Sequence, residues 1–177
     1  MEVDVSPRLT VYHANQCAPK RCTGLKLKRF GLARVVNRIR FLPKRAIVLN
    51  PFSEIAFSPS DKERLKDFGL VALDCSWEHA EKVILKHVKG TSRCLPILFA
   101  GNPVNYGKAT KLNTVEALAA GLYISGFKER AQSILSIFSW GHSFLEINNI
   151  LLEKYATAKS SLEIVQIQNE LIKDRSS

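Results

Sequence analysis

The chain has 177 residues, 46% of them hydrophobic, which is enough for one domain, or two small ones, with a real core. No apolar run approaches the roughly 18 residues of a membrane span, and the N-terminus lacks the apolar segment of a signal peptide. We therefore expect a cytoplasmic protein without a membrane segment. Its four cysteines form no repeated Cys-x-x-Cys pair, which argues against a zinc ribbon.

The net charge of +10 is concentrated in the first third of the chain. Residues 1–50 hold eleven Lys and Arg against Glu2 and Asp4, which gives +9, whereas residues 51–177 hold fifteen basic and fourteen acidic side chains, which gives +1. Protein surfaces without a binding role usually carry positive and negative side chains together, so the basic first third is typical of a surface that binds nucleic acid. A solvated charged face is the alternative interpretation.

In chain order, the first third predicts a strand at residues 9–12, a polar loop at 13–23, a basic helix at 26–36 and a strand at 46–49. Gly31 weakens the helix. The middle third predicts a helix capped by Ser60 and Glu63 that ends before Gly69, a strand at 70–73, a helix at 78–88, and a strand at 95–98. The last of these runs into a loop rich in Gly, Asn and Pro at 101–107.

Asn113 and Glu116 have the spacing of a capping box, which predicts a helix with small residues directly after this loop. Strands and helices thus alternate, which indicates an α/β sheet, and ligands bind such sheets at the carboxyl ends of the strands. Three loops should therefore converge, at residues 50–51, 74–77 and 100–107. The remainder predicts helices only, at residues 127–138, 142–156 and 161–172, with frayed residues after them.

Few side chains suggest chemistry by themselves. Asp74 follows a predicted strand and lies beside Trp77, so its carboxylate could bind an amino group or accept a proton while the indole covers an adenine. A helix cap and a core tryptophan are the alternatives. Residues 101–109 lack the spacing and the Ser or Thr of a phosphate-binding P-loop, and His13, Cys17 and Cys22 form only a weak metal candidate, so we expect no metal site.

Four blocks resemble one known family. They are Lys-Arg-Cys-Thr-Gly-Leu-Lys-Leu at residues 20–27, Asp-Cys-Ser-Trp at 74–77, the stretch from Leu-Pro at 95–96 to Asn-Pro-Val-Asn-Tyr-Gly at 102–107, and Lys-Leu and Glu-Ala at 111–112 and 116–117. Together they closely resemble the small-subunit rRNA aminocarboxypropyltransferases of archaea and eukaryotes, which act in ribosome biogenesis. The resemblance spans roughly residues 9–155.

The resemblance implies an α/β fold with a SPOUT-like, trefoil-knotted C-terminal domain that binds S-adenosylmethionine, preceded by a small basic N-terminal α/β domain. We place the RNA-facing domain at residues 1–69 and the knotted domain with its C-terminal helices at 70–177. The implied reaction moves the aminocarboxypropyl group, and not the methyl group, to N3 of a pseudouridine or N1-methylpseudouridine in small-subunit rRNA. Methylthioadenosine is the other product.

The resemblance also implies roles for particular residues. Asp74 matches an acidic position near the reactive end of the cofactor. The expected cofactor-binding residues are Thr23, Leu49, Pro51, Val71, Trp77, Leu95, Leu98, Tyr106, Leu112, Thr114 and Ala117. The expected RNA phosphate contacts are Lys20, Arg21, Lys26, Lys28, Arg29 and Arg34.

Two other functions fit the same sequence features. One is an S-adenosylmethionine-dependent RNA methyltransferase of SPOUT type, which differs in the group transferred. The other is a non-catalytic ribosome-assembly factor that only holds rRNA through the basic first third. We expect a monomer, because the C-terminal helices would cover the surface through which many knotted methyltransferases dimerise.

Overall fold

The structure is a computed structural model that describes residues 6–16 and 18–176, without the side chains of Trp77, residues 83–85, Arg175 and Ser176. The strands in this part are β1 (Leu9–His13), β2 (Arg34–Val36), β3 (Ile47–Leu49), β4 (Leu70–Asp74) and β5 (Thr91–Arg93). The α-helices are α1 (Thr23–Arg29), α2 (Lys62–Phe68), α3 (Trp77–His87), α4 (Thr114–Ile124), α5 (Lys128–Ser136), α6 (Gly141–Ile147), α7 (Asn149–Thr157) and α8 (Ser161–Ser176). Two 3-10 helices are η1 (Ile39–Phe41) and η2 (Pro59–Asp61). No helix in this part is long and apolar enough to cross a membrane.

The five strands form one parallel sheet in the order β2-β1-β4-β3-β5. The predicted α/β class is therefore confirmed. The register sets His13 of β1 opposite Asp74 of β4, so both residues lie at the carboxyl edge of the sheet. Because β1, β2 and β3 precede residue 69 while β4 and β5 follow it, the sheet includes strands from both predicted domains.

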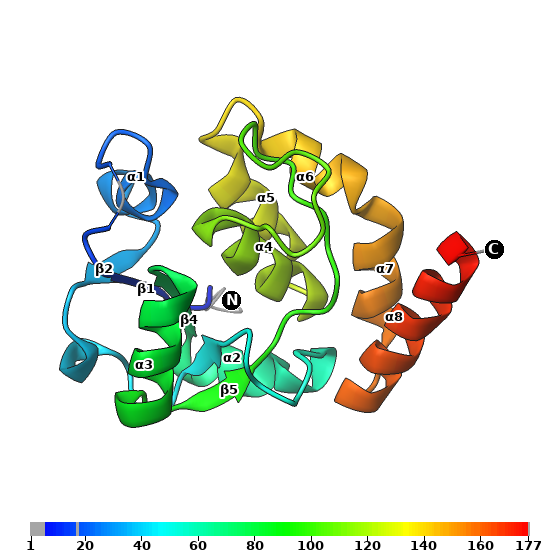
Figure 1. Ribbon diagram of the computed structural model, residues 1–177, viewed down its shortest axis with the longest axis horizontal. Coiled ribbons are helices and arrows are strands. Elements are labelled where there is room, and N and C mark those ends of the chain that lie inside the picture. The colour runs from blue at the N-terminus through cyan, green and yellow to red at the C-terminus, as the bar shows by residue number, and fades with distance from the viewer. Residues whose placement is uncertain (1–5, 17, 177) are drawn as a thin grey trace, which may run out of the picture.

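Alternation along the central strands creates two apolar faces. Val11, Leu70 and Ala72 belong to the larger core, which also contains buried residues of α4 to α8, whereas Tyr12 and Val71 belong to a smaller core on the other face. Helix α4 contacts β4 directly and packs against α5 and α7. Figure 1 shows α7 and α8 at the end of the molecule opposite to α1, with α4, α5 and α6 between them.

The helix predicted at residues 26–36 is confirmed only for residues 26–29 and is wrong beyond them. Helix α1 ends at Arg29, Gly31 takes a left-handed backbone with φ of 68°, and the chain then enters β2, which pairs with β1. Glycine adopts this conformation without steric cost, so the helix ends where the sequence had weakened it. The β-branched Val35 and Val36 then favour a strand.

The predicted strand at residues 95–98 is also wrong, because the strand β5 ends at Arg93. The polar backbone groups of the following segment are instead satisfied by side chains of the C-terminal helices. Gln168 accepts from the N–H of Ile97, Tyr155 donates to the carbonyl of Ile97, and Asn148 both accepts from and donates to the backbone of Phe99. Together with the N–H of Thr110, which donates to the carbonyl of Leu98, these contacts give the segment its hydrogen bonds outside any regular strand.

Three further helix boundaries differ from the predictions. The helix expected at residues 142–156 is divided into α6 and α7 at the buried Asn148, whose side chain also binds the carbonyl of Phe144. A capping box does precede α2, but Ser58 and Asp61 form it, not Ser60 and Glu63. Helix α8 continues to Ser176, past the predicted end at residue 172.

Gly101 lies so close to α6 that we expect its substitution to destabilise the fold. An added Cβ would lie 2.4 Å from the backbone nitrogen and 2.5 Å from the Cα of Phe144, and neither atom belongs to a flexible side chain. Gly101→Ala should lower the free energy of unfolding by about 3 kcal/mol in urea titrations. Gly31→Ala, where the added Cβ meets nothing within 4 Å, should cost only about 1 kcal/mol of backbone strain. Equal destabilisation by the two variants would contradict the close approach at Gly101.

Candidate active site

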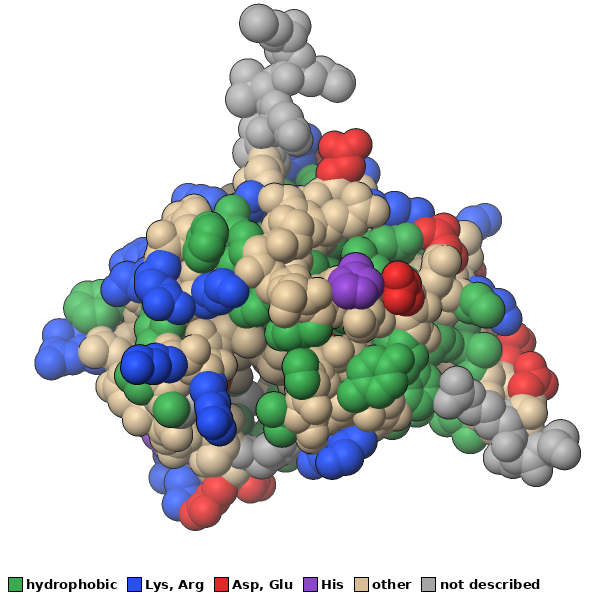
Figure 2. Space-filling view, turned by 90° about the horizontal axis from the view of Figure 1, so that it is seen from above, with side chains coloured by type: hydrophobic (Ala, Val, Ile, Leu, Met, Phe, Trp, Pro, Cys, Tyr) green, Lys and Arg blue, Asp and Glu red, His purple; other side chains and the backbone are tan. Residues whose placement is uncertain are grey.

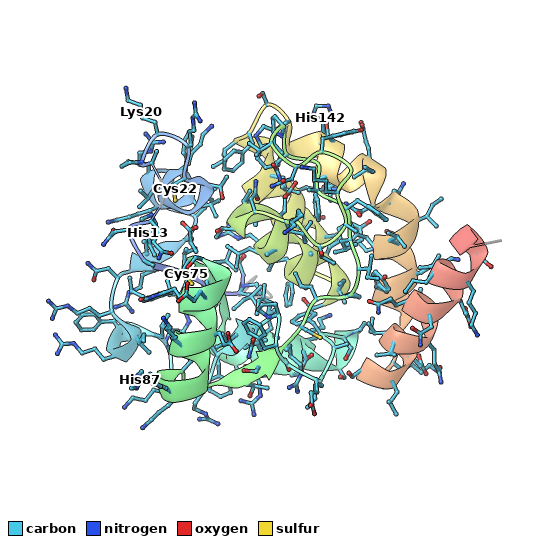
Figure 3. All side chains as sticks on the ribbon, viewed as in Figure 1. His13, Lys20, Cys22, Cys75, His87 and His142 are labelled. Atoms are coloured by element: carbon cyan, nitrogen blue, oxygen red, sulfur yellow. The ribbon has the colours of Figure 1, made fainter. Side chains whose placement is uncertain are left out.

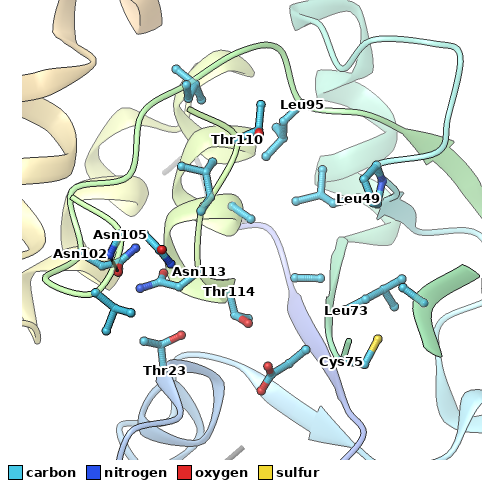
Figure 4. Close-up of a pocket in the computed structure, with 18 of the residues that line it drawn as sticks. Thr23, Leu49, Leu73, Cys75, Leu95, Asn102, Asn105, Thr110, Asn113 and Thr114 are labelled. Carbon is cyan, nitrogen blue, oxygen red and sulfur yellow. Dashed lines mark hydrogen bonds between the residues drawn. The ribbon is translucent and has the colours of Figure 1, made fainter. Parts of the chain in front are cut away.

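One cavity of about 690 Å³ lies at the carboxyl ends of β3 and β4. Its walls come from the start of α1, from the loops after β3 and β4, and from residues 94–117, so the three loops that were expected to converge do meet here. Figure 4 shows side chains from these segments directed toward a common space. Ligand cavities commonly have volumes of about 300–1,000 Å³, so a small organic molecule fits.

The cavity has an apolar part and an amide-rich part. The apolar lining residues are Leu49, Pro51, Ala72, Leu73, Ala80, Leu95, Pro96, Leu98, Pro103, Val104, Leu112, Ala117 and Trp140. The amide and hydroxyl lining residues are Thr23, Asn50, Asn102, Asn105, Thr110, Asn113 and Thr114. Such a combination suits a ligand with a flat apolar ring at one end and amino, hydroxyl or carboxylate groups at the other.

Glu116 fixes the loop that forms the amide-rich part. Its carboxylate is fully buried and accepts hydrogen bonds from the backbone N–H groups of Gly101 and Asn102 and from the Asn102 side chain, each at 2.8 Å. It also accepts from the N–H of Asn113 at 2.9 Å, and Asn113 in turn caps α4. The predicted capping box is therefore confirmed, and the same carboxylate extends it to a loop that precedes the helix.

Asp74 ends β4 and lines the cavity, with its side chain 21% exposed. The Cys22 thiol donates to Asp74 Oδ2 at 3.0 Å, and His13 Nε2 lies 3.7 Å from the same oxygen. Among the described residues, these three side chains form a group whose ligand atoms lie within 4.8 Å of one another, and all three are residue types that bind metals.

The hydrogen bonds of His13 favour a proton-bearing nitrogen at this cluster. The backbone N–H of Asn15 donates to His13 Nδ1 at 3.0 Å, which requires a lone pair on Nδ1 and places the ring proton of a neutral imidazole on Nε2. Asn15 Oδ1 also lies 3.1 Å from Nδ1, but a side-chain amide can rotate whereas the backbone N–H cannot. The imidazole therefore presents an N–H to Asp74, which suits a carboxylate better than a metal ion.

Most of the residues predicted to bind the cofactor line this cavity. They are Thr23, Leu49, Pro51, Leu95, Leu98, Leu112, Thr114 and Ala117, together with the predicted catalytic Asp74. Val71 does not, because strand alternation turns it to the opposite face of the sheet from Ala72. Tyr106 is 63% exposed and lies outside the lining, although Val104 and Asn105 belong to it. The side chain of Trp77 lies outside the described residues.

Several lining residues were not predicted from the sequence. Asn102, Asn105 and Asn113 had been interpreted as turn and capping residues, which they also are. Trp140 comes from the helical C-terminal part, where nothing in the local sequence pattern indicates that it reaches a cavity formed by residues 20 or more positions upstream.

The basic residues predicted to bind RNA lie on α1 or just before it, and the start of α1 borders the cavity, except Arg34, which begins β2 and lines a second pocket at the amino ends of the strands. Lys20, Arg21, Lys28, Arg29 and Arg34 are exposed, while Lys26 is half-buried with Nζ 4.7 Å from the ring centre of Phe138. Arg21 also lines the cavity. Figure 2 shows Lys and Arg side chains gathered on the side of the molecule that carries α1, next to a hollow in the surface. An RNA strand whose phosphates bind this surface would thus bring its bases near the cavity.

Cys75 lines the cavity but should be unreactive. Burial, and then the charge of Asp74, raise the pKa of the Cys75 thiol to about 11. Because the thiolate is the reactive form, we expect slow alkylation of Cys75 by iodoacetamide at neutral pH and a steep increase only at strongly alkaline pH, measured by mass spectrometry of peptides. Rapid alkylation at neutral pH would contradict this environment.

Comparisons with known proteins agree on one family. The family described as "Ribosome biogenesis protein, C-terminal" matches residues 47–172. The 16S rRNA aminocarboxypropyltransferase of Methanosarcina mazei is 52% identical over 93% of this chain and 94% of its own length. The enzyme of the same name from Methanocaldococcus jannaschii is 46% identical over 94% of this chain and 97% of its own length.

A second family description, "Possible Fer4-like domain in RNase L inhibitor", matches residues 7–40. An iron–sulfur cluster of the ferredoxin type is held by four thiolates, and this segment contains only Cys17 and Cys22. The residues present therefore do not fit such a cluster.

Among solved structures, the SAM-dependent rRNA:acp-transferase Tsr3 from Vulcanisaeta distributa matches with a TM-score of 0.82. It is 38% identical, and the match covers 95% of this chain and 97% of that one. Sequence and fold thus agree over almost the whole length, which is more than the resemblance over residues 9–155 had predicted. The chain belongs to the family of 16S rRNA aminocarboxypropyltransferases.

Proposed function

We propose that this protein transfers the 3-amino-3-carboxypropyl group of S-adenosylmethionine to N3 of a pseudouridine or N1-methylpseudouridine in small-subunit rRNA, with release of methylthioadenosine. The observation that carries the proposal is the cavity, which combines apolar walls, a loop of amide groups and one carboxylate beside a basic surface. Relatives at 46% and 52% identity carry the corresponding name, and they match over almost their whole length.

S-Adenosylmethionine supplies a sulfonium whose attached carbons are open to nucleophilic attack. The apolar walls at Leu49, Leu95 and Leu98 are suited to hold an adenine, and the amides of Asn102 and Asn105 are suited to its polar end. An in-line displacement requires the attacking nitrogen, the γ-carbon and the sulfur on one line. A cavity that exposed the γ-carbon and shielded the methyl group would therefore select the transferred group.

Asp74 is the residue suited to act on the proton of N3. As the new N–C bond forms and the C–S bond breaks, the N3 proton must leave, and the carboxylate of Asp74 at the cavity wall can accept it or can orient the amino group of the cofactor. Because the sulfonium is already a good leaving group, alignment by the walls should supply much of the rate.

The finer features of the family fold belong to the same proposal. We expect the trefoil knot to include the residues between β5 and α4, because this stretch runs along the cavity before α4 packs on β4. The division at residues 69 and 70, the monomeric state and the cytoplasmic location also stay predictions.

The position of a radioactive label would test the function. We would incubate the protein with small-subunit rRNA and S-adenosylmethionine labelled either in the carboxyl carbon or in the methyl group. Carboxyl label alone in the RNA is the expected result. Methyl label alone would favour an RNA methyltransferase of the same fold, and absence of both labels with retained RNA binding would favour an assembly factor.

Salt dependence would test the basic surface. Removal of one phosphate-binding side chain should reduce the slope of log K against log salt concentration by about 0.7–0.9. Lys28→Ala and Arg29→Ala should therefore weaken rRNA binding and flatten the slope in filter-binding measurements. Lys159→Ala, which removes an exposed charge from the segment between α7 and α8, is the matched control and should leave the slope unchanged. A slope that none of these variants changes would contradict the RNA-facing role.

A further inference from the structure

The carboxylate of Asp74 is held by two neighbours that no part of the proposed mechanism has used. Cys22 precedes α1 as its N-cap residue, and its sulfur accepts from the N–H of Leu25 at 3.4 Å while its thiol donates to Asp74 Oδ2. The N-cap position thus fixes where the sulfur lies. The thiol reaches Asp74 across 52 residues of sequence.

His13 approaches the same oxygen from the neighbouring strand. The register of β1 and β4 sets the two residues opposite each other, and the N–H of Ala14 donates to the carbonyl of Asp74 at 3.1 Å. The ring of His13 is buried, and Asn15 holds Nδ1 from the other side, with a left-handed backbone at φ of 57°. The fold therefore sets His13 Nε2 at 3.7 Å from Asp74 Oδ2.

Figure 3 shows His13 and Cys22 next to each other beside α1, while His87 lies at the far end of α3. A carboxylate at the end of a strand would otherwise rotate among several rotamers, and proton acceptance requires an approach of about 2.6–3.2 Å. The hydrogen bond from the Cys22 thiol to Oδ2 restricts this rotation, and His13 Nε2 lies near the same oxygen. The Nε2 distance of 3.7 Å exceeds a hydrogen bond, but catalytic contacts often shorten when the substrate binds.

We propose that His13 and Cys22 are positioning residues that hold the Asp74 carboxylate in the orientation needed for the transfer step, an inference that rests on the proposed function. The step itself is unchanged: the N3–C bond forms, the C–S bond breaks, methylthioadenosine leaves, and the N3 proton passes to Asp74. His13 contributes its Nε2–H and Cys22 its thiol S–H, and both act through the Asp74 carboxylate.

Pairs of variants distinguish a positioning role of His13 and Cys22 from a role in packing alone. His13→Ala and Cys22→Ala remove the donors, whereas His13→Gln and Cys22→Ser keep an N–H or O–H in their place. We expect the alanine variants to slow single-turnover transfer about 10- to 100-fold, the effect of misplacing a catalytic group by about 1 Å. The dissociation constant for S-adenosylmethionine should stay within about threefold, and the Gln and Ser variants should recover most of the rate. His87→Gln, at an exposed position, is the matched control and should transfer at the wild-type rate.

Three results would overturn the inference. Alanine variants that transfer at the wild-type rate would remove both residues from the step, and conservative variants as slow as the alanine variants would indicate packing alone. The third result needs no folded variant: ¹⁵N spectra of labelled histidine in the wild-type protein should show the Nε2–H tautomer for His13, and an Nδ1–H tautomer would contradict it. Wild-type protein that transfers no label contradicts the proposed function itself, and the positioning inference then fails with it.

Discussion

Replacing Glu116 with alanine should unfold or nearly unfold the protein. The fully buried carboxylate accepts four hydrogen bonds, from three backbone N–H groups and the Asn102 amide. Each buried donor left without an acceptor costs about 1–3 kcal/mol, so Glu116→Ala should lower the free energy of unfolding by about 4 kcal/mol or more. A typical domain has only about 5–15 kcal/mol of stability, so this single change removes a large part of it.

Glu116→Gln gives the sharper measurement because it keeps the shape of the side chain. One oxygen still accepts from Gly101 and Asn102, but the new amide NH₂ faces the N–H of Asn113 and creates a contact between two donors. We expect a loss of about 2 kcal/mol in urea titrations and weaker binding of S-adenosylmethionine, since Asn102 and Asn113 line the cavity. Glu170→Gln on the exposed side of α8 is the matched control and should stay within about 0.5 kcal/mol of wild type. If Glu116→Gln were as stable as the control Glu170→Gln, a water molecule would have to replace the lost carboxylate oxygen as the acceptor.

Local patterns predicted those parts of the fold that depend on neighbours in sequence. Short, mostly apolar runs predicted β1, β3 and β4, and the spacing of Asn113 and Glu116 predicted the start of α4. The reach of the same Glu116 to Gly101, fifteen residues earlier, follows from no local rule. Likewise, residues 97–99 look like a strand from their composition, but Ile97 and Phe99 take their hydrogen-bond partners from the side chains of Asn148, Tyr155 and Gln168, which only tertiary packing brings close.

The candidate site divides in the same way. Parallel-sheet topology predicted that loops 50–51, 74–77 and 100–107 meet, and they do. Thr23 and Leu112 entered the prediction through family resemblance and not through periodicity. Helix packing brings Trp140 to the cavity, and strand register and helix position bring His13 and the Cys22 thiol to Asp74. Neither helix packing nor strand register can be inferred from the spacing of residues in the sequence.

Asp74→Asn should reduce single-turnover transfer about 100-fold, the usual contribution of a positioned proton acceptor. Asparagine keeps the size of the side chain and an oxygen that can accept from Cys22, so the cluster should stay folded while the charge and the basic oxygen are removed. The measurement is the rate at which carboxyl label enters rRNA with enzyme in excess, compared with Asp67→Asn at an exposed position of α2 as the matched control. Wild-type rates in Asp74→Asn would remove Asp74 from the mechanism.

Two roles for Asp74 give different results in the same variant. If the carboxylate accepts the N3 proton, the dissociation constant for S-adenosylmethionine should change little, and the slow transfer by Asp74→Asn should recover at alkaline pH, where the N3–H of the nucleobase ionises without help. If the carboxylate orients the amino group of the cofactor, loss of a charged hydrogen bond worth about 1.5–3 kcal/mol should weaken cofactor binding at least tenfold, and alkaline pH should not restore the rate. The Cys22 thiol that donates to Asp74 Oδ2 favours the first result, because this contact already fixes the orientation of the carboxylate at the cavity wall toward an incoming base.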